Sequence, residues 1–99
     1  MDLGLQGRVC VVTGASRGIG RETARLLCAE GADVLLLSRE EGALAAAAGE
    51  LQAAGGGRAS HLALDVTDED AGERMLAAAS ERFGPVDVLV NNAGAARWR

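Results

Sequence analysis

The sequence predicts an α/β fold, namely the N-terminal half of a doubly wound parallel sheet. Four short apolar runs alternate with three stretches of helical spacing, which gives the order β-α-β-α-β-α-β. Each run is apolar at successive residues, as is typical of parallel strands that are covered on both faces. Right-handed crossovers between such strands predict the spatial order 3-2-1-4.

The first two strands and helices follow from this pattern. Residues 8–12 are the first expected strand, and after a glycine-rich turn residues 21–30 have helical spacing, with Gly31 suited to the left-handed cap position. Residues 33–37 are the second expected strand. An alanine-rich helix should then run from about residue 40 to residue 54 and bury one face of leucine and alanine side chains.

The second half of the chain repeats the alternation. Residues 58–64 are the third expected strand, and Thr67 is a suitable N-cap for the third helix. The pair Gly84-Pro85 should end that helix, because the residue before a proline disfavours helical geometry. Residues 86–90 are then the fourth expected strand, and no internal repeat or linker interrupts the chain.

Composition and charge limit the classes of function. The 99 residues suffice for one modest domain, and the hydrophobic share of 48% indicates a globular protein. The net charge of −4 gives no electrostatic basis for binding nucleic acid or an anionic membrane. We find neither a membrane-spanning run nor a signal peptide, and therefore expect a cytoplasmic location. Cys10 and Cys28 lack metal-like spacing, so we expect buried, reduced thiols and no metal site.

The glycine-rich turn at residues 13–20 has the features of a phosphate-binding site. It joins a buried strand to a helix, where glycines let the backbone approach a ligand and the helix N-terminus favours an anion. A P-loop requires a lysine, and the chain has none. The pattern Gly-x-Gly-x-x-Gly also fails, because the spacing is Gly14-x3-Gly18-x-Gly20.

This spacing resembles the Thr-Gly-x3-Gly-x-Gly cofactor motif of the short-chain dehydrogenase/reductase family. A second match follows the fourth expected strand, where Asn91-Asn92-Ala93-Gly94 resembles the Asn-Asn-Ala-Gly motif that steadies the central sheet and lines the cofactor cleft in that family. The alternative for the Asn pair is a simple turn, since asparagine tolerates left-handed geometry. The resemblance covers nearly the whole chain, up to about Gly94, and implies a Rossmann-like fold.

Two further matches follow the second and third expected strands. Ser38-Arg39 stands where the family chooses its cofactor, and Asp65-Val66 resembles the pair that contacts the adenine. The alternative for Asp65 is a strand-end residue that starts the turn to Thr67. The resemblance thus implies that residues 1–99 are part of an NADP-binding Rossmann domain, with these cofactor-binding residues: Gly14, Ala15, Ser16, Arg17, Gly18, Ile19, Gly20, Ser38, Arg39, Asp65, Val66, Asn91, Ala93 and Gly94.

The residues after the second strand predict a preference for NADP(H) over NAD(H). An NAD site carries an acid there to bind the ribose 2′-hydroxyl, whereas a 2′-phosphate requires that acid to be absent and a cation nearby. Ser38 removes the carboxylate, and Arg39 and Arg17 offer two guanidinium groups. Glu40 and Glu41 are adjacent acids that could interfere, but we assign them to the first turn of the second helix as partners of its dipole.

The family's chemistry is missing from this sequence. Carbonyl reduction in the family depends on a tyrosine, a lysine four residues later and a serine, all beyond the fourth strand. The chain contains no tyrosine and no lysine, so we predict no catalytic residue in it and no activity for the chain alone. Two alternatives stay open, a non-catalytic NADP(H)-binding module and a truncated product without function.

The fourth expected strand should lie at an edge of this half sheet. Residues 86–90 would then present an apolar edge with unpaired backbone groups, which is a site of association. We expect either the missing C-terminal half of the enzyme or a second copy of the chain to cover it.

Overall fold

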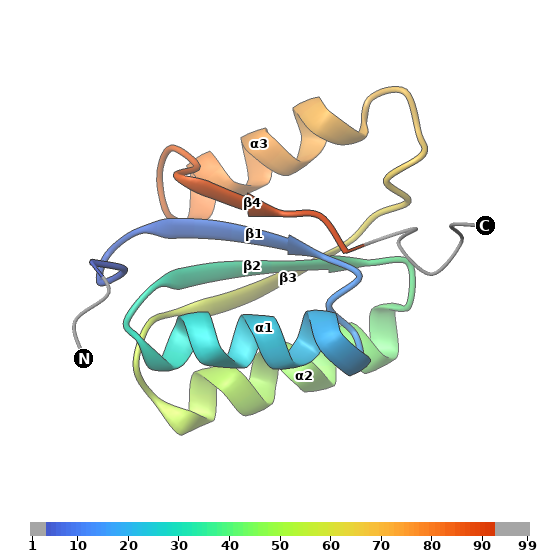
Figure 1. Ribbon diagram of the computed structural model, residues 1–99. Helices are drawn as coiled ribbons and strands as arrows, with labels where there is room; N and C mark the ends of the chain where they lie inside the picture. The colour runs from blue at the N-terminus through green and yellow to red at the C-terminus, as the bar shows by residue number, and fades with distance from the viewer. Residues whose placement is uncertain (1–3, 93–99) are drawn as a thin grey trace.

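The structure is a computed structural model that describes residues 4–92. It contains a four-stranded parallel sheet in the order β3-β2-β1-β4, which confirms the predicted topology (Figure 1). The elements alternate as expected: β1 (Val9–Thr13), α1 (Gly18–Ala29), β2 (Asp33–Ser38), α2 (Glu41–Ala54), β3 (Ala59–Ala63), α3 (Ala71–Arg82) and β4 (Val88–Val90).

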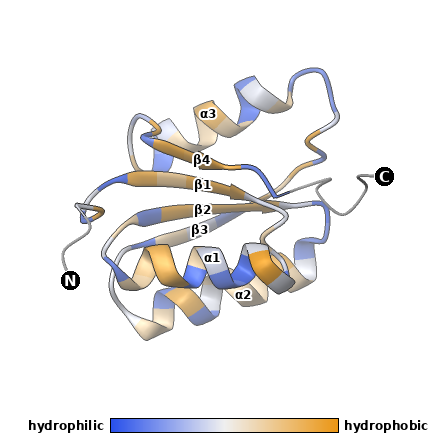
Figure 2. Cartoon of the chain, viewed as in Figure 1, coloured by the Kyte–Doolittle hydropathy of each residue, from blue (hydrophilic) through white to orange (hydrophobic). Residues whose placement is uncertain are grey.

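The sheet is covered on both faces, with α1 and α2 on one side and α3 on the other (Figure 1). Successive residues of a strand point to opposite faces, so the unbroken apolar runs of β1 and β2 feed two separate cores. Val12 and Leu36 belong to the cluster under α1 and α2, while Val11 and Leu35 belong to the cluster under α3. Figure 2 shows the same pattern as hydrophobic strands between helices of mixed hydropathy.

The register of the strands brings the turns that follow β1, β2 and β3 to one edge of the sheet. Thr13 at the end of β1 pairs with Leu37 of β2, and Ser38 pairs with Ala63 at the end of β3. The carboxyl ends of these strands and the N-termini of α1 and α2 therefore lie together, at the right of Figure 1. In open α/β sheets this is the edge where ligands bind.

Helix α1 begins inside the glycine turn, at Gly18, three residues before the expected start. Helix α3 begins later than predicted, at Ala71, and Thr67 is not its cap. The reason is Asp65, whose Oδ1 accepts hydrogen bonds from the backbone N–H and the hydroxyl of Thr67, at 2.9 and 2.7 Å. These bonds hold Thr67 in a turn, so Asp70 takes the N-cap position.

Strand β4 is shorter than predicted and is an edge strand of the described sheet. The strand begins at Val88 because Asp87, just before it, contacts the start of β1 through both its backbone and its side chain. The N–H of Asp87 donates to the carbonyl of Val9, and Asp87 Oδ2 accepts the N–H of Val9 at 2.9 Å. Leu89 is more than half exposed, whereas β1 and β2 are almost fully buried. Within residues 4–92, none of the helices combines the length and apolar character that crossing a bilayer requires.

Candidate functional site

A pocket of about 570 Å³ opens at the carboxyl edge of the sheet. Three loops and the end of β4 surround it. It is lined by seven of the predicted cofactor-binding residues, Gly14, Ser16, Arg17, Ser38, Arg39, Asp65 and Val66, together with Leu64, Thr67, Glu40 and Asn92. Residues from four separate segments of the sequence thus meet around one cavity.

The glycine turn needs its glycines for two different reasons. Gly14 and Gly18 have φ angles of 61° and 63°. This is a left-handed backbone conformation that residues with a Cβ rarely adopt. Gly20 has an ordinary φ, but a Cβ there would lie 2.1 Å from the carbonyl oxygen of Gly14. The first turn of α1 therefore packs directly against the glycine turn. That first turn carries no acid and no side-chain cap, which leaves its N–H groups available to an anion.

The other seven predicted residues are absent from the pocket lining, and two of these seven lie outside the described part of the chain. Ala15 is buried, and its N–H donates to the carbonyl of Leu37 at 3.0 Å, which anchors the turn to β2. Ile19 is largely exposed in the first turn of α1. Ala93 and Gly94 lie outside the described residues, and their role stays a prediction.

Thr13 and the Asn pair fasten the end of β4 to the end of β1. Thr13 Oγ1 donates to Asn91 Oδ1 at 2.9 Å and accepts the N–H of Asn92, also at 2.9 Å. Asn91 is thereby committed to the sheet, in line with the steadying role that the resemblance implies. Asn92 instead lines the pocket, and its side-chain Nδ2 is buried without a hydrogen-bond partner among the described residues. A buried donor without a partner is costly, and a ligand oxygen would satisfy it.

Sequence reasoning placed Asn91 in the site and left Asn92 out. The motif carried both residues, but only the register of β4 against β1 decides which of the two side chains turns toward the pocket.

The charges of the pocket are arranged differently from the prediction. Glu40 stands at the N-cap position of α2, and only Glu41 lies in the first turn. The carboxylate of Glu40 reaches back to the glycine turn, where Oε1 accepts from Ser16 Oγ at 3.1 Å and Oε2 accepts from Arg17 Nη2 at 2.6 Å. The assignment of Glu40 to the first turn as a dipole partner was therefore wrong, because its side chain has nearer donors. Glu41 pairs with His61, 2.8 Å from Nε2.

The second predicted cation, Arg39, approaches Asp65 with 4.0 Å between Nη1 and Oδ2. Asp65 starts the turn to Thr67, as the alternative interpretation has it, and it also lines the pocket. Its contact with the adenine stays a prediction. Ser38 Oγ accepts the N–H of Glu40 at 2.9 Å, which leaves the hydroxyl proton to donate to a ligand oxygen.

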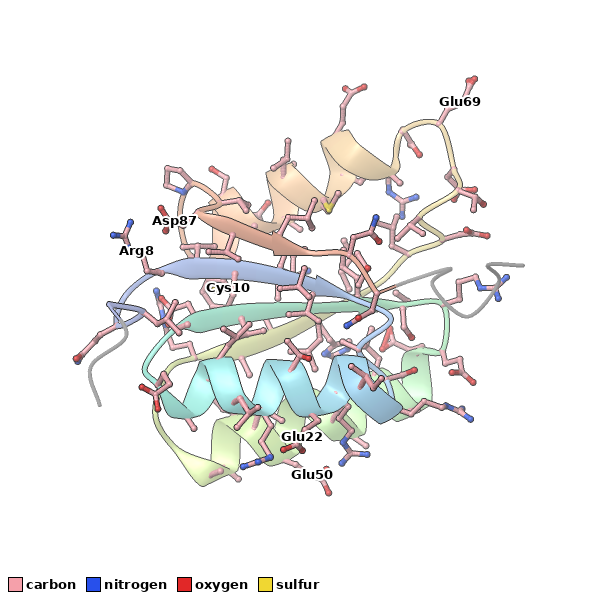
Figure 3. The ribbon with its side chains drawn as sticks, in the orientation of Figure 1. Arg8, Cys10, Glu22, Glu50, Glu69 and Asp87 are labelled. Carbon is pink, nitrogen blue, oxygen red and sulfur yellow. The ribbon has the colours of Figure 1, made fainter. Side chains whose placement is uncertain are left out.

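A second hollow, of about 410 Å³, lies between α1 and α2. Its rim carries two ion pairs, Arg21 with Glu50 and Arg25 with Glu22. Figure 3 shows Glu22 and Glu50 on the side of the helices that faces away from the sheet. Gly18 of the glycine turn lines one end of this hollow, but the rest of its lining comes from α1, α2 and the residues after α2. Both arginines have carboxylate partners, and the hollow does not include the residues that follow β2 and β3, where a doubly wound sheet binds its nucleotide.

The fold and the glycine turn define an α/β chain with a ligand pocket at its strand ends. A family model described as short chain dehydrogenase matches residues 8–99, and the chain belongs to that family. The match includes every predicted cofactor-binding residue.

Individual relatives agree with this assignment. The chain is 50% identical over 90 residues to an L-rhamnose 1-dehydrogenase (NAD(P)(+)) of Azotobacter vinelandii, covering 88% of this chain and 35% of the relative. It is 44% identical to a 3-oxoacyl-[acyl-carrier-protein] reductase of Vibrio harveyi, covering 96% of this chain and 37% of the relative. Among solved structures, L-sorbose reductase from Gluconobacter frateurii, complexed with NADPH and L-sorbose, matches with a TM-score of 0.89 and 38% identity, over 96% of this chain and 36% of that one. The chain therefore spans about a third of the length of the relatives it matches.

Proposed function

We propose that this chain is the cofactor-binding part of an NADP-dependent short-chain oxidoreductase, which transfers a hydride between NADP(H) and a carbonyl or secondary alcohol. The observation that carries the proposal is the pocket at the strand ends, where the glycine turn, Ser38 and two arginines, Arg17 and Arg39, meet. We take residues 1–99 as part of one NADP-binding domain.

Each predicted residue has a physical role in this proposal. The turn from Gly14 to Gly20 and the N-terminus of α1 hold the diphosphate through backbone N–H groups. Arg17, Ser38 and Arg39 hold the 2′-phosphate, because guanidinium groups match phosphate geometry. We assign Asp65 and Val66 to the adenine, and Ala93 and Gly94 to the cleft on the other side of the turn. Asn91 supports that side of the cleft by holding the end of β4 against β1.

The pocket passes a simple test of fit for a dinucleotide phosphate. Gly20 lies so close to Gly14 that the turn has no room for a side chain at this position. The side-chain amide of Asn92 is a buried donor with no hydrogen-bond partner among the described residues, and a ligand oxygen would accept from it. When bound, NADPH would supply the hydride. The residues described above bind and orient the cofactor, and none of them is proposed as a proton donor.

The names of two relatives support the choice of cofactor without fixing it for this chain. One solved neighbour was crystallised with NADPH, and one curated relative is named for NAD(P)(+). The preference for NADP(H) over NAD(H) therefore rests on Ser38 and the two arginines.

Catalysis requires residues that this sequence lacks. The family's tyrosine and lysine have no counterpart in a chain without tyrosine or lysine, so we propose that the 99 residues alone bind NADP(H) without turnover. In a longer protein, the C-terminal half would supply both the catalytic groups and a neighbour for the exposed edge of β4. A second copy of the chain is the alternative partner for that edge. A non-catalytic NADP(H)-binding module and a truncated product without function remain the alternatives to the enzyme.

Thermal unfolding with and without nucleotide tests the proposal. A ligand that binds only the folded chain stabilises it by about 2.7 kcal/mol at 100 times its Kd, which raises Tm by roughly 10–20 °C in a chain of this size. We expect this rise with NADPH, a smaller one with NADH at the same concentration, and no NADPH oxidation with a panel of aldehydes and ketones. No rise with either nucleotide would refute the binding proposal, and turnover by the purified chain would refute the proposed inactivity.

A further inference from the structure

Glu40 occupies a place that an anion would be expected to take in the proposed site. Both of its carboxylate oxygens accept hydrogen bonds from the glycine turn, one from Ser16 Oγ and the other from Arg17 Nη2. Its own N–H donates to Ser38 Oγ at 2.9 Å, which fixes where its side chain starts. One acid thus touches three residues that line the pocket.

We infer that Glu40 is a specificity-determining residue of the cofactor site, which competes with the 2′-phosphate of NADP for Arg17 and Ser16 and so narrows the preference for NADP over NAD. This inference rests on the proposed function. Glu40 is not among the predicted cofactor-binding residues. Its effect on the preference for NADP over NAD is opposite to that proposed for Ser38, Arg39 and Arg17.

The competition follows from charge and reach. A phosphate that binds Arg17 must displace the carboxylate or share the guanidinium with it, and two anions on one cation repel each other. The Arg17 side chain is 71% exposed and that of Glu40 is 53% exposed, so their pair is weak and exchangeable. A 2′-hydroxyl is neutral and can donate to the carboxylate. Glu40 therefore weakens NADP binding and leaves NAD binding unchanged or stronger.

The contacts of Glu40 also have a purely structural interpretation. Glu40 ties the glycine turn to the start of α2, across 23 and 24 residues of sequence. If that were its whole role, removing its charge would lower Tm and weaken both nucleotides by the same factor. The ratio of the two affinities separates the interpretations, because a structural effect cancels in the ratio.

The test compares Glu40→Gln with Glu41→Gln in the 99-residue chain. The two variants make the same change in net charge at adjacent positions, but Glu41 pairs with His61 instead of Arg17. Isothermal titration gives Kd for NADPH and NADH. For Glu40→Gln we expect NADPH binding to tighten about 3- to 5-fold with NADH unchanged or weaker, which is the upper range for one exposed charge pair. Glu41→Gln should leave the ratio of the two Kd values within about 2-fold of wild type.

Two further variants complete the experiment. Glu40→Ser removes the charge and places a favourable N-cap residue at the start of α2, so it should shift the ratio in the same direction even if Glu40→Gln folds poorly. In the Arg17→Gln background, Glu40→Gln should no longer tighten NADPH, because the contested cation is gone. An unchanged ratio in both Glu40 variants, or a gain that persists without Arg17, overturns the inference alone. If the wild-type chain binds neither nucleotide, the proposed function fails and the inference fails with it.

Discussion

Each end of the parallel strands carries an ion pair between an arginine and a carboxylate, and the two pairs differ in exposure and in their hydrogen bonds. At the amino edge Asp33 receives three hydrogen bonds from Arg58, one from the backbone N–H and two from the guanidinium, and its side chain is only 12% exposed. At the carboxyl edge Arg17 and Glu40 also form an ion pair, but both are mainly exposed around a cavity. A pair that is bonded on several sides contributes to stability, whereas an open pair can be exchanged for a ligand.

A second pair strengthens this comparison. Asp87 accepts the N–H of Val9 and lies 3.6 Å from the guanidinium of Arg8, at the left of Figure 3 and far from the pocket. Its carboxylate therefore joins β4 to β1 at the amino edge, while Thr13 and the Asn pair join them at the other. Charged groups therefore join β4 to β1 at the amino edge, and neutral hydrogen bonds join the same two strands at the carboxyl edge.

The largest effect should come from closing the space at the carboxyl edge. Gly20→Ala places a Cβ against the backbone of Gly14, so we expect a loss of about 2–4 kcal/mol in unfolding free energy and loss of NADPH binding. Urea unfolding followed by circular dichroism measures the former. Gly49→Ala is the matched control, because its Cβ meets nothing within 4 Å in α2, and it should stabilise the chain by about 0.5–1 kcal/mol. Equal effects of the two substitutions would contradict the close packing of the turn.

At the amino edge, Asp33→Asn should cost about 1–2 kcal/mol of unfolding free energy without changing nucleotide preference. Hydrogen bonding by the Arg58 side chain is the main cause that lowers the pKa of Asp33, against a smaller opposing effect of burial. A lowered folded pKa means stability that is fully present above the unfolded value of about 4 and is lost as the pH falls through the folded pKa. The difference between wild type and variant should therefore be constant near neutral pH and shrink below about pH 4.

Equilibrium unfolding across that pH range measures this effect. The exposed pair of Glu22 with Arg25 provides the control, and Glu22→Gln should change stability much less than Asp33→Asn. A difference that grew on acidification would contradict the sign of the Asp33 contribution.

The smallest of these effects concerns the pocket at the carboxyl edge of the sheet. Ser38→Asp restores an acid at the end of β2, where it can accept from a ribose hydroxyl and repels a 2′-phosphate, so the preference should move toward NADH by about 10-fold. Ser80→Asp makes the same charge change on the exposed surface of α3 and should leave the preference unchanged. Titration of both nucleotides measures the shift, and equal losses for NADPH and NADH would show that the ribose site lies elsewhere.

Much of the fold could be predicted because it is encoded in local patterns. Uninterrupted apolar runs gave the strands, and the crossover rule gave their order, which the structure confirms. The ends of α3 and β4 were mispredicted for one reason: Asp65 and Asp87 use their side chains as backbone partners, and no periodicity reveals such a choice.

For the candidate site, the sequence by itself determined which residue types are present and at which strand ends they fall. The glycine spacing, Ser38, Arg39 and Asp65 follow from motifs, and register then brings them to one pocket. Only the tertiary structure decided that Glu40 bonds Ser16 and Arg17, and that Asn92 rather than Asn91 lines the cavity. These contacts join loops that are 23 or more residues apart in the sequence. The direction in which each side chain points there depends on how the strands pair, and not on which residues are neighbours along the chain.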